Sequence, residues 1–128
     1  REIWAKTRKV MAAAVIRRLF GASGYSRLVR QENGVIHTMS AVNRKGLFFP
    51  IKIDENSPKS SIDFFVLNLC RSMADYVITT GEILRTEPEV TTRIQGEYQK
   101  ELSEWRRTVR TRDREAIPIV LSRRLRAF

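Results

Sequence analysis

The residues that could do chemistry lie where a short apolar segment meets a glycine. Thr79 and Thr80 end the segment 76–80, and Gly81 follows directly. Hydroxyl groups and exposed amides at the start of a helix hold phosphates, and a glycine lets a ligand approach the backbone. Arg85 adds a positive charge one helical turn later. This pattern is typical of a phosphate-binding turn, although a purely structural turn has the same pattern.

The other reactive side chains give no catalytic or metal site. His37 and Cys70 are the only residues of their types. No nucleophile is placed beside His37, Cys70 falls among apolar residues of an expected helix, and the acidic residues lack metal-ligand spacing. We therefore expect no metal and name no catalytic residue. A single cysteine suits a reducing compartment, cytoplasmic or mitochondrial.

Local patterns predict the elements that position these residues. Helix-favouring residues predict a helix over 1–20, ended by a loop at Gly21 to Gly24. β-Branched and apolar runs predict the following segments: a strand at 35–42, a turn at 43–46, an apolar segment at 47–53, a buried strand at 76–80 and a strand at 117–122.

Helical spacing predicts two further elements on either side of the strand 76–80. Ser60 or Ser61 is expected to cap a helix that contains Asp63 in its first turn. A single helical turn is expected at 82–85, and the polar segment 95–112 has three candidate anchors, Tyr98, Leu102 and Trp105. Alternating short strands and helices predict an α/β fold with parallel strands, whose carboxyl ends are the usual ligand sites.

Charge is concentrated at the two ends of the 128-residue chain. Residues 1–30 hold eight basic residues against one acidic, residues 31–104 hold eight against eleven, and residues 105–128 hold eight against two, for a net charge of +10. Basic ends suit RNA or another polyanion, or an anionic membrane surface, or else form a solubilising fringe.

The first 20 residues admit more than one interpretation. They are rich in Arg and Ala, which is typical of a mitochondrial transit peptide, but we interpret them as a packing or docking helix. Their weak amphipathicity argues against docking on a membrane surface. No apolar run approaches the roughly 20 residues needed to span a bilayer.

Residues 63–87 align, without gaps, with the pattern D-x-x-L-L-x-x-L-R-x-x-A-D-A-V-L-V-G-A-G-T-V-R-x-E and match it in part. The matching positions are Asp63, Leu67, Arg71, Ala74, Asp75, Val77, Arg85 and Glu87. Residues 118–123 are similar to a strand pattern P-x-x-V-V-S-R, and residues 37–46 to an opening strand with an S-x-D-G turn. Over about residues 35–124 the chain thus resembles the pyrimidine reductases of riboflavin biosynthesis, which have a dihydrofolate-reductase-like fold.

This resemblance implies a mostly parallel central sheet with flanking helices, an NADPH cofactor, a phosphorylated pyrimidine substrate and a homodimer. By resemblance, Thr79, Thr80, Gly81, Glu82 and Arg85 are expected at the cofactor, and Ser40 and Asn43 near the substrate. Glu82, however, stands where the family has a glycine, and its carboxylate would repel a phosphate.

The resemblance covers only the N-terminal half of the reductase fold. We expect a basic helix and loop at 1–34, a reductase-like domain at 35–124 and a basic tail at 125–128. The open sheet edge needs cover from a second chain or from residues 1–34. Two functions follow: an NADPH-dependent reductase-like domain, partial or diverged, or a non-catalytic basic α/β protein that binds RNA or docks in a larger assembly.

Overall fold

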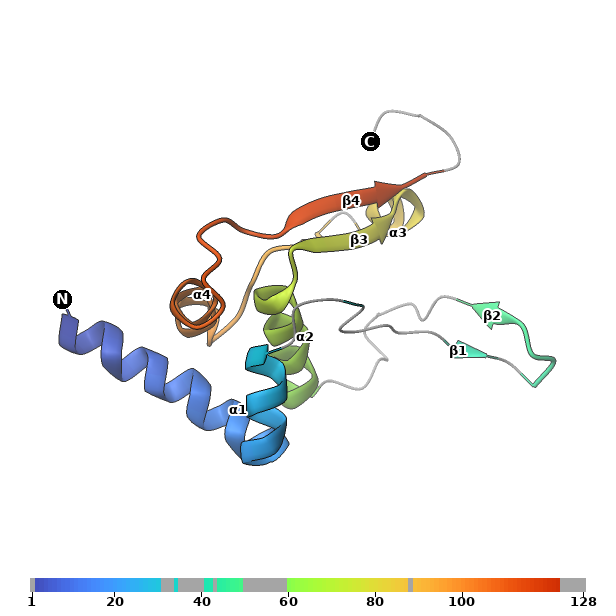
Figure 1. The fold of residues 1–128 in the computed structure, drawn as a ribbon. Coiled ribbons are helices and arrows are strands. Elements are labelled where there is room, and N and C mark those ends of the chain that lie inside the picture. The colour runs from blue at the N-terminus through green and yellow to red at the C-terminus, as the bar shows by residue number, and fades with distance from the viewer. Residues whose placement is uncertain are drawn as a thin grey trace.

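The computed structural model describes residues 2–30, 34, 41–42, 44–49, 60–87 and 89–122. Its elements, in chain order, are α1 (Glu2–Arg30), β1 (Ala41–Val42), β2 (Phe48–Phe49), α2 (Ser61–Met73), β3 (Tyr76–Thr80), α3 (Gly81–Thr86), α4 (Gln99–Thr108) and β4 (Ile117–Leu121). Figure 1 shows α1, α2 and α4 grouped on one side of the molecule and β3 with β4 on the other. The mixed α/β class predicted from the sequence is confirmed.

Helix α1 does not end where its glycines suggest. The loop expected at Gly21 to Gly24 is wrong, because only Gly21 leaves the helical conformation, at φ 71° and ψ 174°, and the helix resumes directly after it. That combination of angles is essentially restricted to glycine. Gly21 is therefore a kink rather than an end. Across the kink, the Arg17 guanidinium lies 4.6 Å from the centre of the Tyr25 ring.

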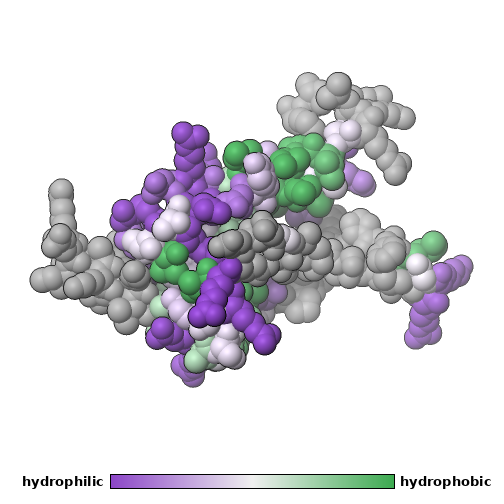
Figure 2. Space-filling model, viewed as in Figure 1, coloured by the Kyte–Doolittle hydropathy of each residue, from purple (hydrophilic) through white to green (hydrophobic). Residues whose placement is uncertain are grey.

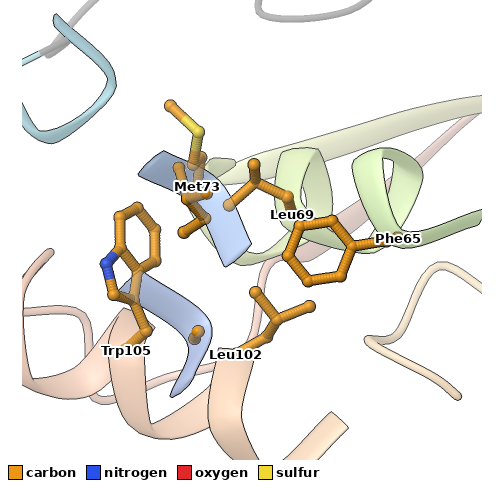
Figure 3. Close-up of a cluster of buried hydrophobic side chains, with 7 residues drawn as sticks. Phe65, Leu69, Met73, Leu102 and Trp105 are labelled. Atoms are coloured by element: carbon orange, nitrogen blue, oxygen red, sulfur yellow. The ribbon is translucent and has the colours of Figure 1, made fainter. Parts of the chain in front are cut away.

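The hydrophobic core lies between the three longer helices. Leu102 and Trp105 of α4, both fully buried, belong to one cluster with Leu69 of α2 and Ile16 of α1. Figure 3 shows the α2 and α4 side chains of this cluster facing one another. Leu102 and Trp105 are thus confirmed as anchors. Tyr98 is half-buried, with its ring edge-on to that of Phe65 at 5.2 Å.

A buried arginine links α4 to the ends of two other elements. The Arg106 side chain is 5% exposed. Its Nη1 donates to the carbonyls of Ser72 (2.9 Å) and Ala74 (2.8 Å) at the end of α2, and its Nε donates to that of Arg114 (2.8 Å). Burial lowers the pKa of this guanidinium, which still remains charged. Arg106 thereby fixes both chain segments that enter the strands.

Strands β3 and β4 form a two-stranded parallel sheet. They pair residue for residue from Tyr76↔Ile117 to Thr80↔Leu121, as the short parallel strands predicted from the sequence would. The expectation that 76–80 is buried is wrong, because Tyr76 and Ile78 are 59% and 62% exposed. The apolar residues of 76–80 are typical of a buried strand, but none of the described residues covers the side of the sheet on which Tyr76 and Ile78 lie.

The remaining strands make a separate hairpin. β1 and β2 pair antiparallel through Ala41↔Phe49 and Val42↔Phe48, and residues 44–46 form the predicted turn. The rest of the predicted segments 35–42 and 47–53 lies outside the described residues. The described part of the chain contains two separate two-stranded sheets. The mixed α/β class is therefore confirmed, whereas the described residues do not form the single central sheet that the resemblance implies.

The helix before β3 begins as predicted. Ser60 caps α2, and its Oγ accepts a hydrogen bond from the Asp63 amide at 3.2 Å. The acidic side chain of Asp63 in the first turn complements the helix dipole. α2 therefore begins at a defined residue, and its last turn is followed closely by β3.

Candidate functional site

The joint between β3 and α3 carries the predicted cofactor residues. Thr80 ends the strand and caps α3, with its Oγ1 accepting from the Ile83 amide at 3.3 Å. Thr79 is half-buried, and Gly81 is buried as the first residue of the helix. The predicted strand, turn and short helix are confirmed here. The Thr80 hydroxyl already satisfies one of the amides that a phosphate would use.

Two charged residues of α3 define the electrostatics of this joint. Glu82 is exposed in the first turn and Arg85 is exposed in the last turn. A carboxylate at the start of a helix stabilises the helix through its dipole, but it occupies the position where an anionic ligand would bind. The joint therefore suits a group that donates hydrogen bonds, such as a ribose hydroxyl, better than a phosphate beside Glu82.

The other predicted site residues are not brought to this joint. Ser40 and Asn43, expected near the substrate, and His37 lie outside the described residues. Cys70 is half-buried on α2, and burial raises the pKa of its thiol, which agrees with a packing role. Among the residues that the structure describes, no three His, Cys, Asp or Glu side chains gather as metal ligands.

Two residues that carry the family resemblance hold the chain together in this structure. Arg71 Nη1 donates to the Arg93 carbonyl at 3.1 Å. Asp75 accepts from Arg112 through both carboxylate oxygens, at 2.7 and 3.4 Å, which holds the pKa of the Asp75 carboxyl below its usual value. The Asp75 carbonyl also accepts from the Ile117 amide where β4 begins, at 2.9 Å.

A small hollow lies beside this group, between α2, α4 and the start of β4. Its lining includes the side chains of Arg71, Arg93, Arg106 and Glu115. The hollow has room for about one water molecule. It is therefore too small for a nucleotide or a phosphate.

The packing of α1 on α4 brings the two basic ends of the chain together. Arg110, just after α4, donates from Nη1 to the carbonyls of Leu28 (3.3 Å) and Val29 (2.7 Å) in the last turn of α1. Arg27 and Arg30 belong to that same turn. A guanidinium at the carboxyl end of a helix also complements its dipole.

We call Arg27, Arg30, Arg110, Arg112 and Arg114 the basic surface. Arg27, Arg30 and Arg114 are exposed. Asp113 is the one acidic residue within the segment 110–114, and Asp75 pairs with Arg112. The surface therefore keeps a net positive charge. Figure 2 shows hydrophilic residues gathered over the connection between α4 and β4 and over the second half of α1.

The sequence shows that both ends of the chain are basic, but it does not show that the segment after α4 lies against the last turn of α1. The sequence predicts Leu102 and Trp105 as anchors and places a basic segment beside them. What was missed is that Arg106 and Arg110 bind main-chain carbonyls of other elements. Every residue has a main-chain carbonyl, so the residue types do not show which carbonyls these arginines bind, and only the fold reveals them.

No family model, curated protein or solved structure matches this chain. No helix in the described part of the chain is both long enough and apolar enough to cross a membrane.

Proposed function

We propose that this chain is a reductase-like α/β unit that binds a nicotinamide dinucleotide, NADPH by resemblance, at the joint between β3 and α3. The observation that carries the proposal is the parallel pairing of β3 with β4, with the helix α3 opening directly at the carboxyl end of β3. Ligands of α/β folds bind at such strand ends. The resemblance over residues 63–87 falls on the helix, strand and turn that form this joint.

Within this proposal the protein binds and orients rather than transfers protons. A nicotinamide cofactor supplies the hydride when bound, so a side-chain acid or base is not required for that step. Gly81 and the end of β3 would support the nucleotide, and Ser40 and Asn43 are the proposed contacts of a phosphorylated pyrimidine. Activity of the whole domain depends on what completes the two-stranded sheet.

Glu82 makes the proposal testable with one substitution. We expect Glu82→Gln to raise NADPH affinity about fivefold, because a carboxylate near a phosphate costs about 1 kcal/mol close to solvent. NADH, which lacks the 2′-phosphate, should gain less. Isothermal titration with both dinucleotides measures the ratio. Glu89→Gln, an exposed carboxylate outside α3, is the matched control.

Thermal unfolding with NADPH, NADH and a short RNA, at low and moderate salt, tests the function itself. A ligand that binds only the folded chain adds about 2.7 kcal/mol at a hundredfold excess over its dissociation constant. Salt-resistant stabilisation by a dinucleotide supports the reductase-like unit. No stabilisation by either dinucleotide, in the natural chain and in Glu82→Gln, contradicts it.

The basic surface favours a second candidate function, the binding of RNA by a non-catalytic α/β module. Its support is the contact of Arg110 with Leu28 and Val29, 82 and 81 residues earlier in the sequence, which joins two basic segments. Arginine binds phosphate with two parallel hydrogen bonds, and neutralising phosphates releases counterions. Binding should therefore weaken steeply as salt rises.

Replacing Arg27 and Arg30 together with glutamine tests this second candidate. Losing two phosphate contacts should lower the slope of log affinity against log salt by about 1.4 for single-stranded RNA. Fluorescence polarisation of a labelled RNA between 50 and 200 mM salt, a range of strong salt dependence, measures it. Arg18→Gln with Lys100→Gln removes the same charge outside the basic surface and should leave the slope closer to that of the natural chain. If both double variants have the same slope, the RNA does not bind at the basic surface.

A further inference from the structure

Helix α1 projects from the rest of the molecule at its kink. Residues 17–23, which surround Gly21, are all exposed, and they cover about two turns of helix. A helix that packs on a core buries one side, so exposure on every side means that this segment stands away from the core. We call residues 17–23 the elbow. In Figure 1 the elbow is the blue bend at the bottom of the picture, away from β3 and β4.

The elbow combines apolar and basic side chains. Leu19 is 37% exposed and Phe20 is 40% exposed, and Arg17 and Arg18 directly precede them. The Arg17 guanidinium lies over the Tyr25 ring, which holds its positive charge beside the bend. The elbow therefore offers two large apolar side chains next to two positive charges.

No acidic residue in this part of the sequence offsets the charge of the elbow. Between Glu2 and Glu32 the chain has seven basic residues and no acidic one. Such a surface suits a partner that is anionic and that also takes up apolar side chains. A membrane surface with anionic lipids meets both requirements, because charged headgroups lie directly above apolar acyl chains.

We propose that the elbow docks on an anionic lipid surface, with Leu19 and Phe20 inserted between the headgroups. The sequence predicts one helix over 1–20, whose weak amphipathicity argues against a helix that lies flat on a membrane. The kink at Gly21 changes this argument, because the chain meets the surface with a bend instead of a helix face. A bend inserts only the apolar residues at its tip, while the neighbouring arginines are attracted to the anionic headgroups.

The apolar residues of the elbow favour lipid over RNA as its partner. Phosphates of RNA attract arginines, and an aromatic ring such as that of Phe20 stacks on a base. RNA has no apolar layer, however, that would take up Leu19. The basic surface, which lies outside the elbow, contains arginines alone. Docking through the elbow is therefore independent of both proposed functions.

Flotation of the full chain with lipid vesicles tests this docking. We expect the chain to bind vesicles of phosphatidylserine and phosphatidylcholine in equal parts, and to bind phosphatidylcholine alone much more weakly. Phe20→Gln should weaken binding at least about fivefold, because the apolar ring no longer enters the lipid. Arg18→Gln should weaken it about fivefold, the effect of one basic residue near an anionic surface.

Two substitutions outside the elbow are the matched controls. Ile78→Gln removes an apolar side chain that is 62% exposed on β3, and Lys100→Gln removes an exposed charge from α4. Each should weaken binding about twofold or less, because charges beyond a Debye length from the lipid are screened. Circular dichroism establishes that all four variants keep their helices.

Quenching by brominated lipids distinguishes insertion of the elbow from attraction by the net charge. In vesicles that contain these lipids, the fluorescence of Phe20→Trp should be quenched more than that of Ile78→Trp. Both variants keep Trp4 and Trp105, so the difference reports the substituted position.

Three results would contradict docking through the elbow. The first is a chain that does not bind the anionic vesicles. The second is an equal effect of Phe20→Gln and Ile78→Gln, since the net charge alone would then hold the chain on the lipid. The third is a Phe20→Gln variant that binds vesicles like the natural chain but binds a short RNA more weakly, which would make the elbow an RNA contact.

Discussion

Arg106→Met is expected to destabilise the fold by about 3 kcal/mol, because removing the guanidinium leaves buried carbonyl groups without donors. In the structure its side chain binds three main-chain carbonyls, those of Ser72, Ala74 and Arg114. Methionine fills much of the same volume but donates no hydrogen bond. Urea unfolding followed by tryptophan fluorescence measures the loss.

The neighbouring residue provides the control for this experiment. Arg107 is exposed and pairs with Glu104 in the same helix at 2.8 Å. Such surface pairs contribute little, so Arg107→Met should change the unfolding free energy by less than about 0.5 kcal/mol. Arg106→Lys keeps the charge but not the planar fork, and should fall between the two. If Arg106→Met and Arg107→Met are equally stable, the buried guanidinium does not hold these segments together.

Trp105→Ala is expected to cost about 3–5 kcal/mol, the range for truncating a buried aromatic residue. Trp105 is fully buried between α1, α2 and α4. A domain of this size has about 5–15 kcal/mol of stability in total, so the variant should lose a large fraction of it. Circular dichroism with urea measures the loss through the helices, since tryptophan fluorescence is changed by the substitution itself.

Trp105→Phe separates packing from hydrogen bonding at this position. The indole Nε1 is buried without a hydrogen-bond partner. Phenylalanine removes this donor and keeps an aromatic ring, so it should cost clearly less than alanine. Hydrogen exchange adds a regional readout, because a loosened α4 should release the amides of α1 first. Similar losses for both substitutions would mean that ring packing contributes little.

Much of the local structure was predictable because it depends on neighbouring residues. Ser60 caps α2, the helical turn expected at 82–85 lies within α3, and Leu102 and Trp105 anchor α4, each as the spacing indicated. These features depend on hydrogen bonds and periodicity over three or four residues. The predicted strand at 117–122 differs from β4 by one residue at its end.

The errors arose where distant parts of the chain decide the outcome. Gly21 bends α1 instead of ending it, and the helix after the kink packs through Leu28 and Val29 against the core. The apolar run of β3 indicated burial, but burial needs a covering layer that the sequence of one strand cannot specify. For the candidate site, the turn at Thr80 and Gly81 was predicted, whereas the meeting of the basic ends through Arg110 was not.

The packing of α1 against α4 also sets an order of events during synthesis. α1 ends at Arg30, while its partner Trp105 is made 75 residues later. At 5–20 residues per second, the ribosome needs about 4–15 s to supply that partner. Most of the stability of a helix in a protein comes from its tertiary packing, which α1 cannot gain from α4 until α4 has been made. The basic helix α1 is therefore made seconds before α4, and during that time it is uncovered by α4 and available to ribosomal RNA or chaperones.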